Sequence, residues 1–68
     1  MNEDKIVQNL AGFKQHSEIN AAIQLIGKSK LKKGSERCKM LAKAKETLFP
    51  FSGDKTIFQA INDLSSIS

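Results

Sequence analysis

Residues 17–27 read SEINAAIQLIG, and the apolar side chains of this segment repeat at the spacing of one helical face. The positions i, i+3, i+4 and i+7 of that face are occupied by Ile19, Ala22, Ile23 and Ile26. Ser17 is placed to cap a helix through its hydroxyl, and Gly27 suits the left-handed residue that commonly follows a helix. The segment therefore predicts a helix over residues 18–26.

A second helical pattern precedes this segment, and a basic segment follows it. Residues 3–14 predict a helix, because Glu3 and Asp4 open it where the helix dipole favours negative charge. Its apolar face consists of Ile6, Val7, Leu10 and Phe13. Residues 28–34 read KSKLKKG, with one apolar residue in seven, and predict a basic connector. A frayed extension of the 18–26 helix is the alternative for these residues.

Two more helices are predicted after the connector. Ser35 can cap a helix over residues 35–49, which should end there because Pro50 disfavours helical geometry in the residue before it. The side chains expected on its buried face are Cys38, Leu41, Ala42, Leu48 and Phe49. Asp54 can cap a final helix, and residues 65–68 are expected to form a frayed tail. The apolar face of the final helix consists of Ile57, Phe58, Ile61 and Leu64.

Together the segments predict one helical domain over residues 1–68, a compact all-α bundle of three to four short helices with a basic connector between the second and the third. Chains of this length bury only about 60% of their unfolded surface, so a large enclosed active-site cleft is not expected. Because such a small core is marginal, a homodimer formed through the first or the last helix is a further expectation. The predicted core consists of Ile6, Leu10, Phe13, Ile19, Ile23, Ile26, Leu41, Leu48, Ile57, Phe58 and Ile61.

The cysteine count and the N-terminal sequence bear on location. A single cysteine, Cys38, excludes an internal disulfide, and small secreted domains usually need several. Residues 1–4 lack the basic start and apolar run of a secretory signal, and no apolar stretch approaches the ~20 residues that cross a bilayer. We therefore expect a cytoplasmic protein without a membrane role. Cys38 is expected in the core, with a reactive thiol between Arg37 and Lys39 as the alternative.

The net charge of +4 is distributed unevenly along the chain. Residues 28–45 hold eight basic side chains and one acidic one, a formal charge of +7, whereas the other residues hold three basic and six acidic side chains, a charge of −3. Concentrated positive charge attracts polyanions at long range. The residues expected to bind nucleic acid or an acidic partner are Lys28, Lys30, Lys32, Lys33, Arg37, Lys39 and Lys43.

The composition of this basic segment limits how it could bind nucleic acid. Base-edge recognition relies on Arg, Asn and Gln, whereas the segment has seven lysines and one arginine. Aromatic platforms for single strands are absent between Phe13 and Phe49. We therefore expect a small regulatory or accessory protein that contacts the backbone of duplex nucleic acid with weak sequence preference. A helix-turn-helix is disfavoured because the predicted connector exceeds the usual turn of three or four residues. A solvated lysine face that only maintains solubility is the alternative without a partner.

An alternative function is a protein-binding adaptor or inhibitor, such as a compact phage- or plasmid-type antagonist, whose lysines dock an acidic protein surface. Lys45 falls on the apolar side of the 35–49 helix, where it either extends to water or meets an acidic group of a partner. The residues expected at a protein interface are Met40, Lys45, Phe49 and Phe51.

Catalytic, metal-binding and cofactor-binding patterns do not emerge from the sequence. His16 is the only histidine, so neither metal-ligand spacing nor a catalytic triad can be assembled from the sequence pattern. The tripeptide at residues 27–29, Gly-Lys-Ser, resembles the end of a phosphate-binding loop, but Ala22 stands where that motif requires its first glycine. We expect a non-enzymatic protein without a metal or a cofactor.

Overall fold

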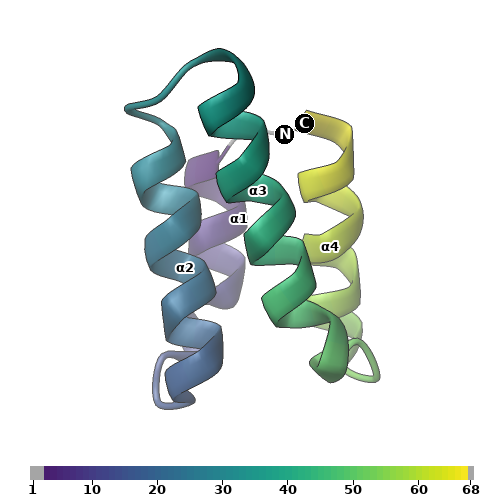
Figure 1. Cartoon of the computed structure of the whole chain (residues 1–68). Coiled ribbons are helices and arrows are strands. Elements are labelled where there is room, and N and C mark those ends of the chain that lie inside the picture. Colours follow the sequence, from purple (N-terminus) through teal and green to yellow (C-terminus); the bar gives the residue numbers. More distant parts are fainter. Residues whose placement is uncertain (1–2, 68) are drawn as a thin grey trace.

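The computed structural model describes residues 3–67, and in this range the chain forms four α-helices and two short 3₁₀ helices (Figure 1). This architecture confirms the all-α bundle that the sequence predicts. The 3₁₀ helices directly continue the first and third α-helices. In chain order the elements are α1 (Glu3–Leu10), η1 (Ala11–Phe13), α2 (Ser17–Ser29), α3 (Gly34–Leu48), η2 (Phe49–Phe51) and α4 (Lys55–Ile67).

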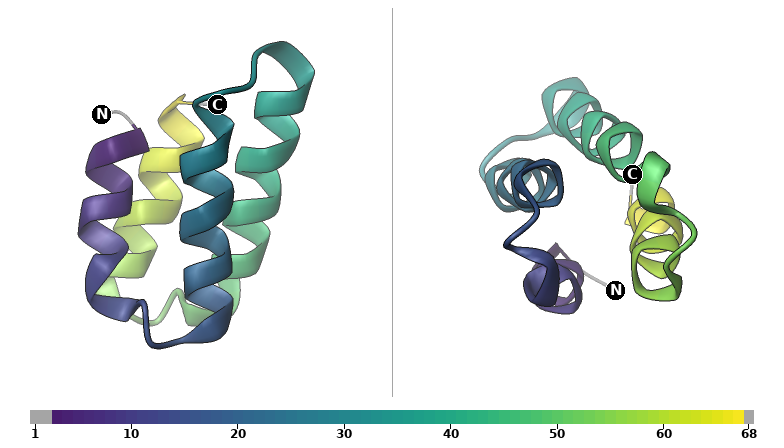
Figure 2. Two further views of the ribbon diagram at one scale, coloured as in Figure 1. Left: turned by 90° about the vertical axis from the view of Figure 1, so that its left-hand side faces the viewer. Right: turned by 90° about the horizontal axis from the view of Figure 1, so that it is seen from below.

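Successive helices run antiparallel, so the bundle has an up-down-up-down topology (Figures 1 and 2). Each helix packs beside its neighbours in sequence, and α4 returns to pack against α1. One end of the bundle carries the start of α1, the end of α4 and the α2–α3 connector, and the opposite end carries η1, η2 and the loops that follow them. The basic connector therefore lies at the same end as the acidic start of α1.

The core is a cluster of twelve buried isoleucine, leucine and alanine side chains. Most of the predicted core residues belong to it, while Phe13 and Ile61 are only partly buried and pack against it. Phe58 was expected in the core but is 53% exposed, because it follows the buried Ile57 and a helix turns ~100° per residue. Leu64, which the predicted core omits, is fully buried. The cluster consists of Ile6, Leu10, Ile19, Ala22, Ile23, Ile26, Leu41, Ala44, Leu48, Ile57, Ala60 and Leu64.

The α2–α3 pair forms the most extensive helix–helix contact in the bundle, and small buried side chains permit it. Ala22 and Ser29 of α2 and Ala44 of α3 are all fully buried, so their backbones can approach closely. The Ser29 hydroxyl donates to the carbonyl of Ile26 at 2.6 Å, which satisfies the polar group inside the core. The helical hairpin of α2 and α3 is therefore the tightest unit of the fold.

The buried face of α3 differs from the expected one. Leu41, Ala44 and Leu48 are buried, but Cys38 and Ala42 are exposed, and Phe49 is 68% exposed. The predicted face was wrong because its centre lies about one residue's rotation away from the true one. The Cys38 thiol is therefore at the surface and not in the core.

The helix ends confirm one predicted cap and correct two others. Asp54 caps α4, since its Oδ1 accepts from the backbone N–H of Thr56 at 2.8 Å and of Ile57 at 3.4 Å. Ser17 and Ser35 do not cap their helices. The N-cap residue of α2 is His16 and that of α3 is Lys33, and neither side chain forms a capping hydrogen bond.

Glycine conformation and the end of the chain also depart from expectation. Gly27 lies within α2, which continues to Ser29, and Gly34, with φ +63°, is the glycine that adopts left-handed geometry. Residues 28–29 are therefore helical, and the connector shrinks to residues 30–33. The frayed tail expected at residues 65–68 is helical through Ile67, whose carbonyl accepts a hydrogen bond from Arg37; Ser68 lies outside the described residues.

Adjacent residues at the end of α3 provide a test of this core. Leu48 is fully buried and Phe49 is 68% exposed. We expect Leu48→Ala to lower the free energy of unfolding by about 2–5 kcal/mol, because it removes buried apolar surface and leaves a residual cavity. Phe49→Ala, which removes a larger side chain, should change it by less than about 0.5 kcal/mol. Urea titration followed by far-UV circular dichroism measures both, and equal effects would contradict the assigned α3 face.

Candidate nucleic-acid interface

The basic segment 28–45 forms the last turn of α2, the connector and most of α3. Six of the seven residues predicted to bind a polyanion have exposed side chains, whereas Arg37 is partly buried. The exposed residues are Lys28, Lys30, Lys32, Lys33, Lys39 and Lys43. The segment therefore presents its lysines along one helical hairpin, with the highest density at the connector.

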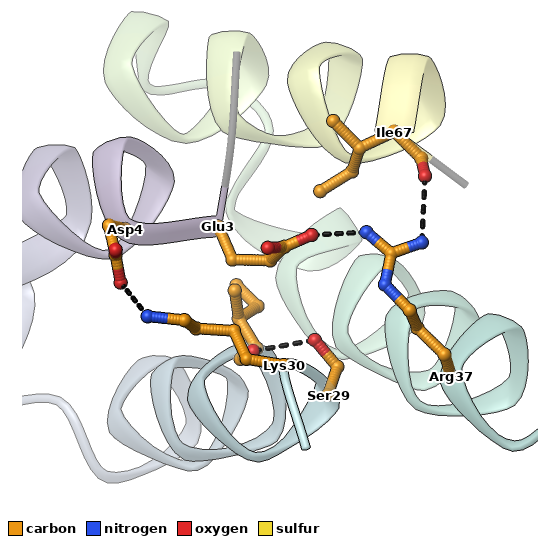
Figure 3. A network of polar contacts seen from close by, with 7 residues as sticks. Glu3, Asp4, Ser29, Lys30, Arg37 and Ile67 are labelled. Carbon is orange, nitrogen blue, oxygen red and sulfur yellow. Dashed lines mark hydrogen bonds and ion pairs between the residues drawn. The ribbon is translucent and has the colours of Figure 1, made fainter. Parts of the chain in front are cut away.

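Arg37 is engaged inside the bundle and links three helices. Its guanidinium forms an ion pair with Glu3 of α1, and its Nη1 donates to the carbonyl oxygen of Ile67 in α4 at 3.1 Å (Figure 3). The Arg37 and Glu3 side chains are 28% and 15% exposed. The one arginine of the chain is thus held by partners that lie 34 and 30 residues away in sequence.

Two of the lysines form exposed ion pairs. Lys30 of the connector pairs with Asp4 of α1 (Figure 3), and Lys32 lies 3.8 Å from the carboxylate of Glu36. All four side chains are at least 42% exposed, and exposed pairs of this kind contribute only about 0–1 kcal/mol. Either lysine could therefore exchange its carboxylate for a phosphate at little energetic cost.

The four other exposed lysines of the segment have no ion pair with any residue between 3 and 67. Lys28 lies in the last turn of α2, Lys33 is the last residue of the connector, and Lys39 and Lys43 lie one turn apart on α3. Lys43 accepts a hydrogen bond at its backbone carbonyl, from the Thr47 hydroxyl at 2.8 Å, so its ammonium group is not used by that contact. These four ammonium groups are the charges most readily offered to a polyanion.

The connector is a turn held by two backbone hydrogen bonds. The N–H of Leu31 donates to the carbonyl of Lys28 at 3.0 Å, and the N–H of Lys32 donates to the carbonyl of Ser29 at 3.1 Å. The Leu31 side chain is 83% exposed, more than any other large hydrophobic side chain described. This leucine was not among the residues predicted to bind a partner, although an isolated apolar side chain inside KSKLKKG is a visible pattern.

The residues predicted for a protein interface are not equivalent in the structure. Met40 and Lys45 are partly buried on α3, and Phe49 is 68% exposed. Phe51 packs against the core, and its ring meets His16 edge to face with centroids 4.5 Å apart. Phe51 therefore helps to close the end of the bundle opposite the connector.

The face between α1 and α4 contains a polar hollow and one buried carboxylate. The hollow is lined by Gln8, Asn9, Lys55, Thr56 and Gln59. Asp63 is 7% exposed, and its Oδ1 accepts from the Gln59 amide at 3.0 Å. Across residues 3–67, no three histidine, cysteine or carboxylate side chains gather where they could hold a metal ion. The described helices are also too short or too polar to cross a bilayer.

The α2–α3 hairpin differs from a helix-turn-helix, although its connector is shorter than predicted. Four residues join the two helices, a length that the motif accepts, but α2 and α3 run antiparallel side by side, whereas the motif crosses its helices at about 90–120°. The geometry therefore presents a lysine-bearing turn and the outer side of α3 in place of a recognition helix.

Comparison with protein-family models, curated proteins and solved structures finds no significant match to this chain.

Arg37 and Lys30 provide a test of which cations the fold uses. We expect Arg37→Ala to lower the free energy of unfolding by about 1–3 kcal/mol, because it leaves the Glu3 carboxylate and the Ile67 carbonyl without their charged donor. Lys30→Ala removes an exposed pair and should lower it by less than about 1 kcal/mol. Chemical denaturation of both variants at low and at high salt compares them; an Arg37 effect as small as that of Lys30 would contradict the structural role.

Proposed function

We propose that this protein binds the phosphate backbone of duplex nucleic acid through the lysines of the α2–α3 hairpin, with weak sequence preference. In this proposal it acts in the cytoplasm as a non-enzymatic regulatory or accessory protein. The observation that carries the proposal is the formal charge of +7 within residues 28–45. Within this segment, the six lysines from Lys28 to Lys43 have exposed side chains, and all of them lie on one helical hairpin.

Weak sequence preference follows from the position of Arg37. Bidentate recognition of a guanine edge by arginine needs a free guanidinium. The guanidinium of Arg37 is not free, because it contacts Glu3 and the carbonyl of Ile67. Lysine ammonium groups are compact charges that bind phosphate without strict geometry. The groups left at the surface are therefore suited to backbone contact and poorly suited to base recognition.

The exposed ion pairs of Lys30 and Lys32 leave both ammonium groups accessible to a phosphate. Lys30 and Lys32 keep their carboxylate partners in the free protein, which holds them in place beside the connector. A phosphate that displaces Asp4 or Glu36 exchanges one exposed ion pair for another and releases a counterion from the nucleic acid. Binding of this type is driven largely by counterion release, so its affinity falls steeply with salt.

A second candidate function is the adaptor or inhibitor that docks an acidic protein. The observation that favours it is the exposure of Phe49 at the end of α3, because exposed aromatic side chains are common anchors of protein interfaces. In that case Phe49 and Lys45 would contact the partner beside the lysines of α3, whereas Phe51 is used within the fold. The homodimer predicted from the sequence stays a prediction.

The salt dependence of binding tests the proposed function. With a labelled random-sequence duplex, we expect log Kd to rise linearly with log salt concentration, and Lys39→Gln/Lys43→Gln to reduce that slope by about 1.8, or about 0.9 for each phosphate that is no longer neutralised. Lys14→Gln/Lys55→Gln removes the same net charge outside the hairpin and should leave the slope nearly unchanged. Fluorescence anisotropy over a salt series provides the slopes.

Two results would contradict the proposal. One is the absence of duplex binding at low salt, and the other is an equal reduction of slope in the two double variants, which would indicate attraction by net charge alone. If duplex binding is absent, Phe49→Ser should abolish binding to an acidic protein partner recovered from nuclease-treated lysate, as the adaptor function requires.

A further inference from the structure

An apolar side chain stands at the tip of the most basic part of the molecule. Leu31 is 83% exposed, and the residues on either side of it are Lys30 and Lys32. The side chain belongs to neither the core cluster nor the apolar residues packed against it. A single exposed leucine is ordinary on a protein surface, so its position within the lysines and its conformation carry the argument.

The conformation of the connector holds Leu31 away from the body of the bundle. The backbone N–H groups of Leu31 and Lys32 both bond to carbonyls in the last turn of α2, at 3.0 and 3.1 Å. In the free protein the ion pairs of Lys30 with Asp4 and of Lys32 with Glu36 lie on either side of Leu31 in the sequence. The left-handed Gly34 then turns the chain into α3. Leu31 is therefore presented to solvent on a hydrogen-bonded turn, and a side chain that needs no rearrangement before it contacts a partner loses less entropy on binding.

We propose that Leu31 is a wedge that enters the minor groove of duplex DNA and partly unstacks one base step, while the lysines around the connector hold the phosphates on both sides. This inference rests on the proposed function and names the form of nucleic acid that the connector fits. Proteins that bind the minor groove commonly insert a leucine or another apolar side chain between base pairs and bend the duplex by about 20–90°.

The distribution of charge around Leu31 suits such a wedge. Lys28, Lys30, Lys32 and Lys33 all lie within three residues of it, so positive charge surrounds the apolar tip. Inserting an apolar side chain unstacks bases, which costs free energy, and additional phosphate contacts on the bent duplex offset that cost. Pyrimidine–purine steps unstack most easily, and the wedge should therefore favour a TA or CA step over a stiff A-tract. An A-form RNA duplex has a wide, shallow minor groove and should not be bent in this way.

The bend itself is the measurement that tests the wedge. A DNA duplex of about 20–30 base pairs with a central TA step carries a donor and an acceptor dye at its ends, and energy transfer is recorded at saturating protein. We expect the wild-type protein to shorten the end-to-end distance of the DNA. Leu31→Ala should bind with affinity reduced by less than about tenfold and leave the duplex straight, with a salt slope smaller by about 0.9 for each phosphate contact that forms only on the bent duplex. Leu31→Met keeps an apolar wedge and should retain the bend.

The controls separate the wedge from backbone binding. Lys39→Gln/Lys43→Gln should weaken binding, yet the saturated complex should remain bent. If the wild-type protein binds DNA with a steep salt slope but leaves the duplex straight, the wedge proposal is overturned and the proposed function stands. Equal bending by Leu31→Ala and wild type would also overturn the wedge, and absence of duplex binding would overturn both proposals. Because Leu31 is not in the core, circular dichroism of Leu31→Ala should match that of the wild type.

Discussion

The contact of Arg37 with Glu3 and Ile67 is the constraint on which the connector end of this bundle depends. A chain of 68 residues has a small core, and the twelve buried apolar side chains are isoleucine, leucine and alanine without an aromatic ring. The Arg37 guanidinium extends from the first turn of α3 and contacts both the first turn of α1 and the last turn of α4. Without it, the ends of α1 and α4 would lose the polar contact that aligns them with the α2–α3 hairpin.

The two ends of the bundle are closed by different chemistry. At the connector end, ion pairs join α1 to the connector and to α3, and charged side chains surround the turn. At the opposite end, Phe13 and Phe51 pack against the core, and the Phe51 ring meets His16. Charged contacts therefore hold the connector end, and apolar and aromatic packing holds the other end.

Local patterns in the sequence predicted the helices well, and contacts between distant residues explain what the patterns missed. Asp54 was identified as a cap because its role depends only on residues two and three positions away. Cys38 was misplaced because Leu41 and Leu48 are compatible with more than one buried face, and packing against α2, which is formed elsewhere in the chain, selected the true one. Arg37 looked like one more basic residue, because neither Glu3 nor Ile67 is near it in sequence. At the candidate site, the basic segment was predictable from composition, but the exposure of Leu31 depends on the fold of the connector and its hydrogen bonds.

Because Glu3 and Ile67 bond to the same guanidinium, the two ends of the described chain lie within the reach of one side chain. A short linker could therefore join them, and the chain could be opened instead in the loop at residues 52–54, at the far end of the bundle. Such a circular permutant would keep the α2–α3 connector and Arg37 intact while moving both new ends to the opposite end of the bundle. Labels or fused domains could then be attached far from the lysines of the connector.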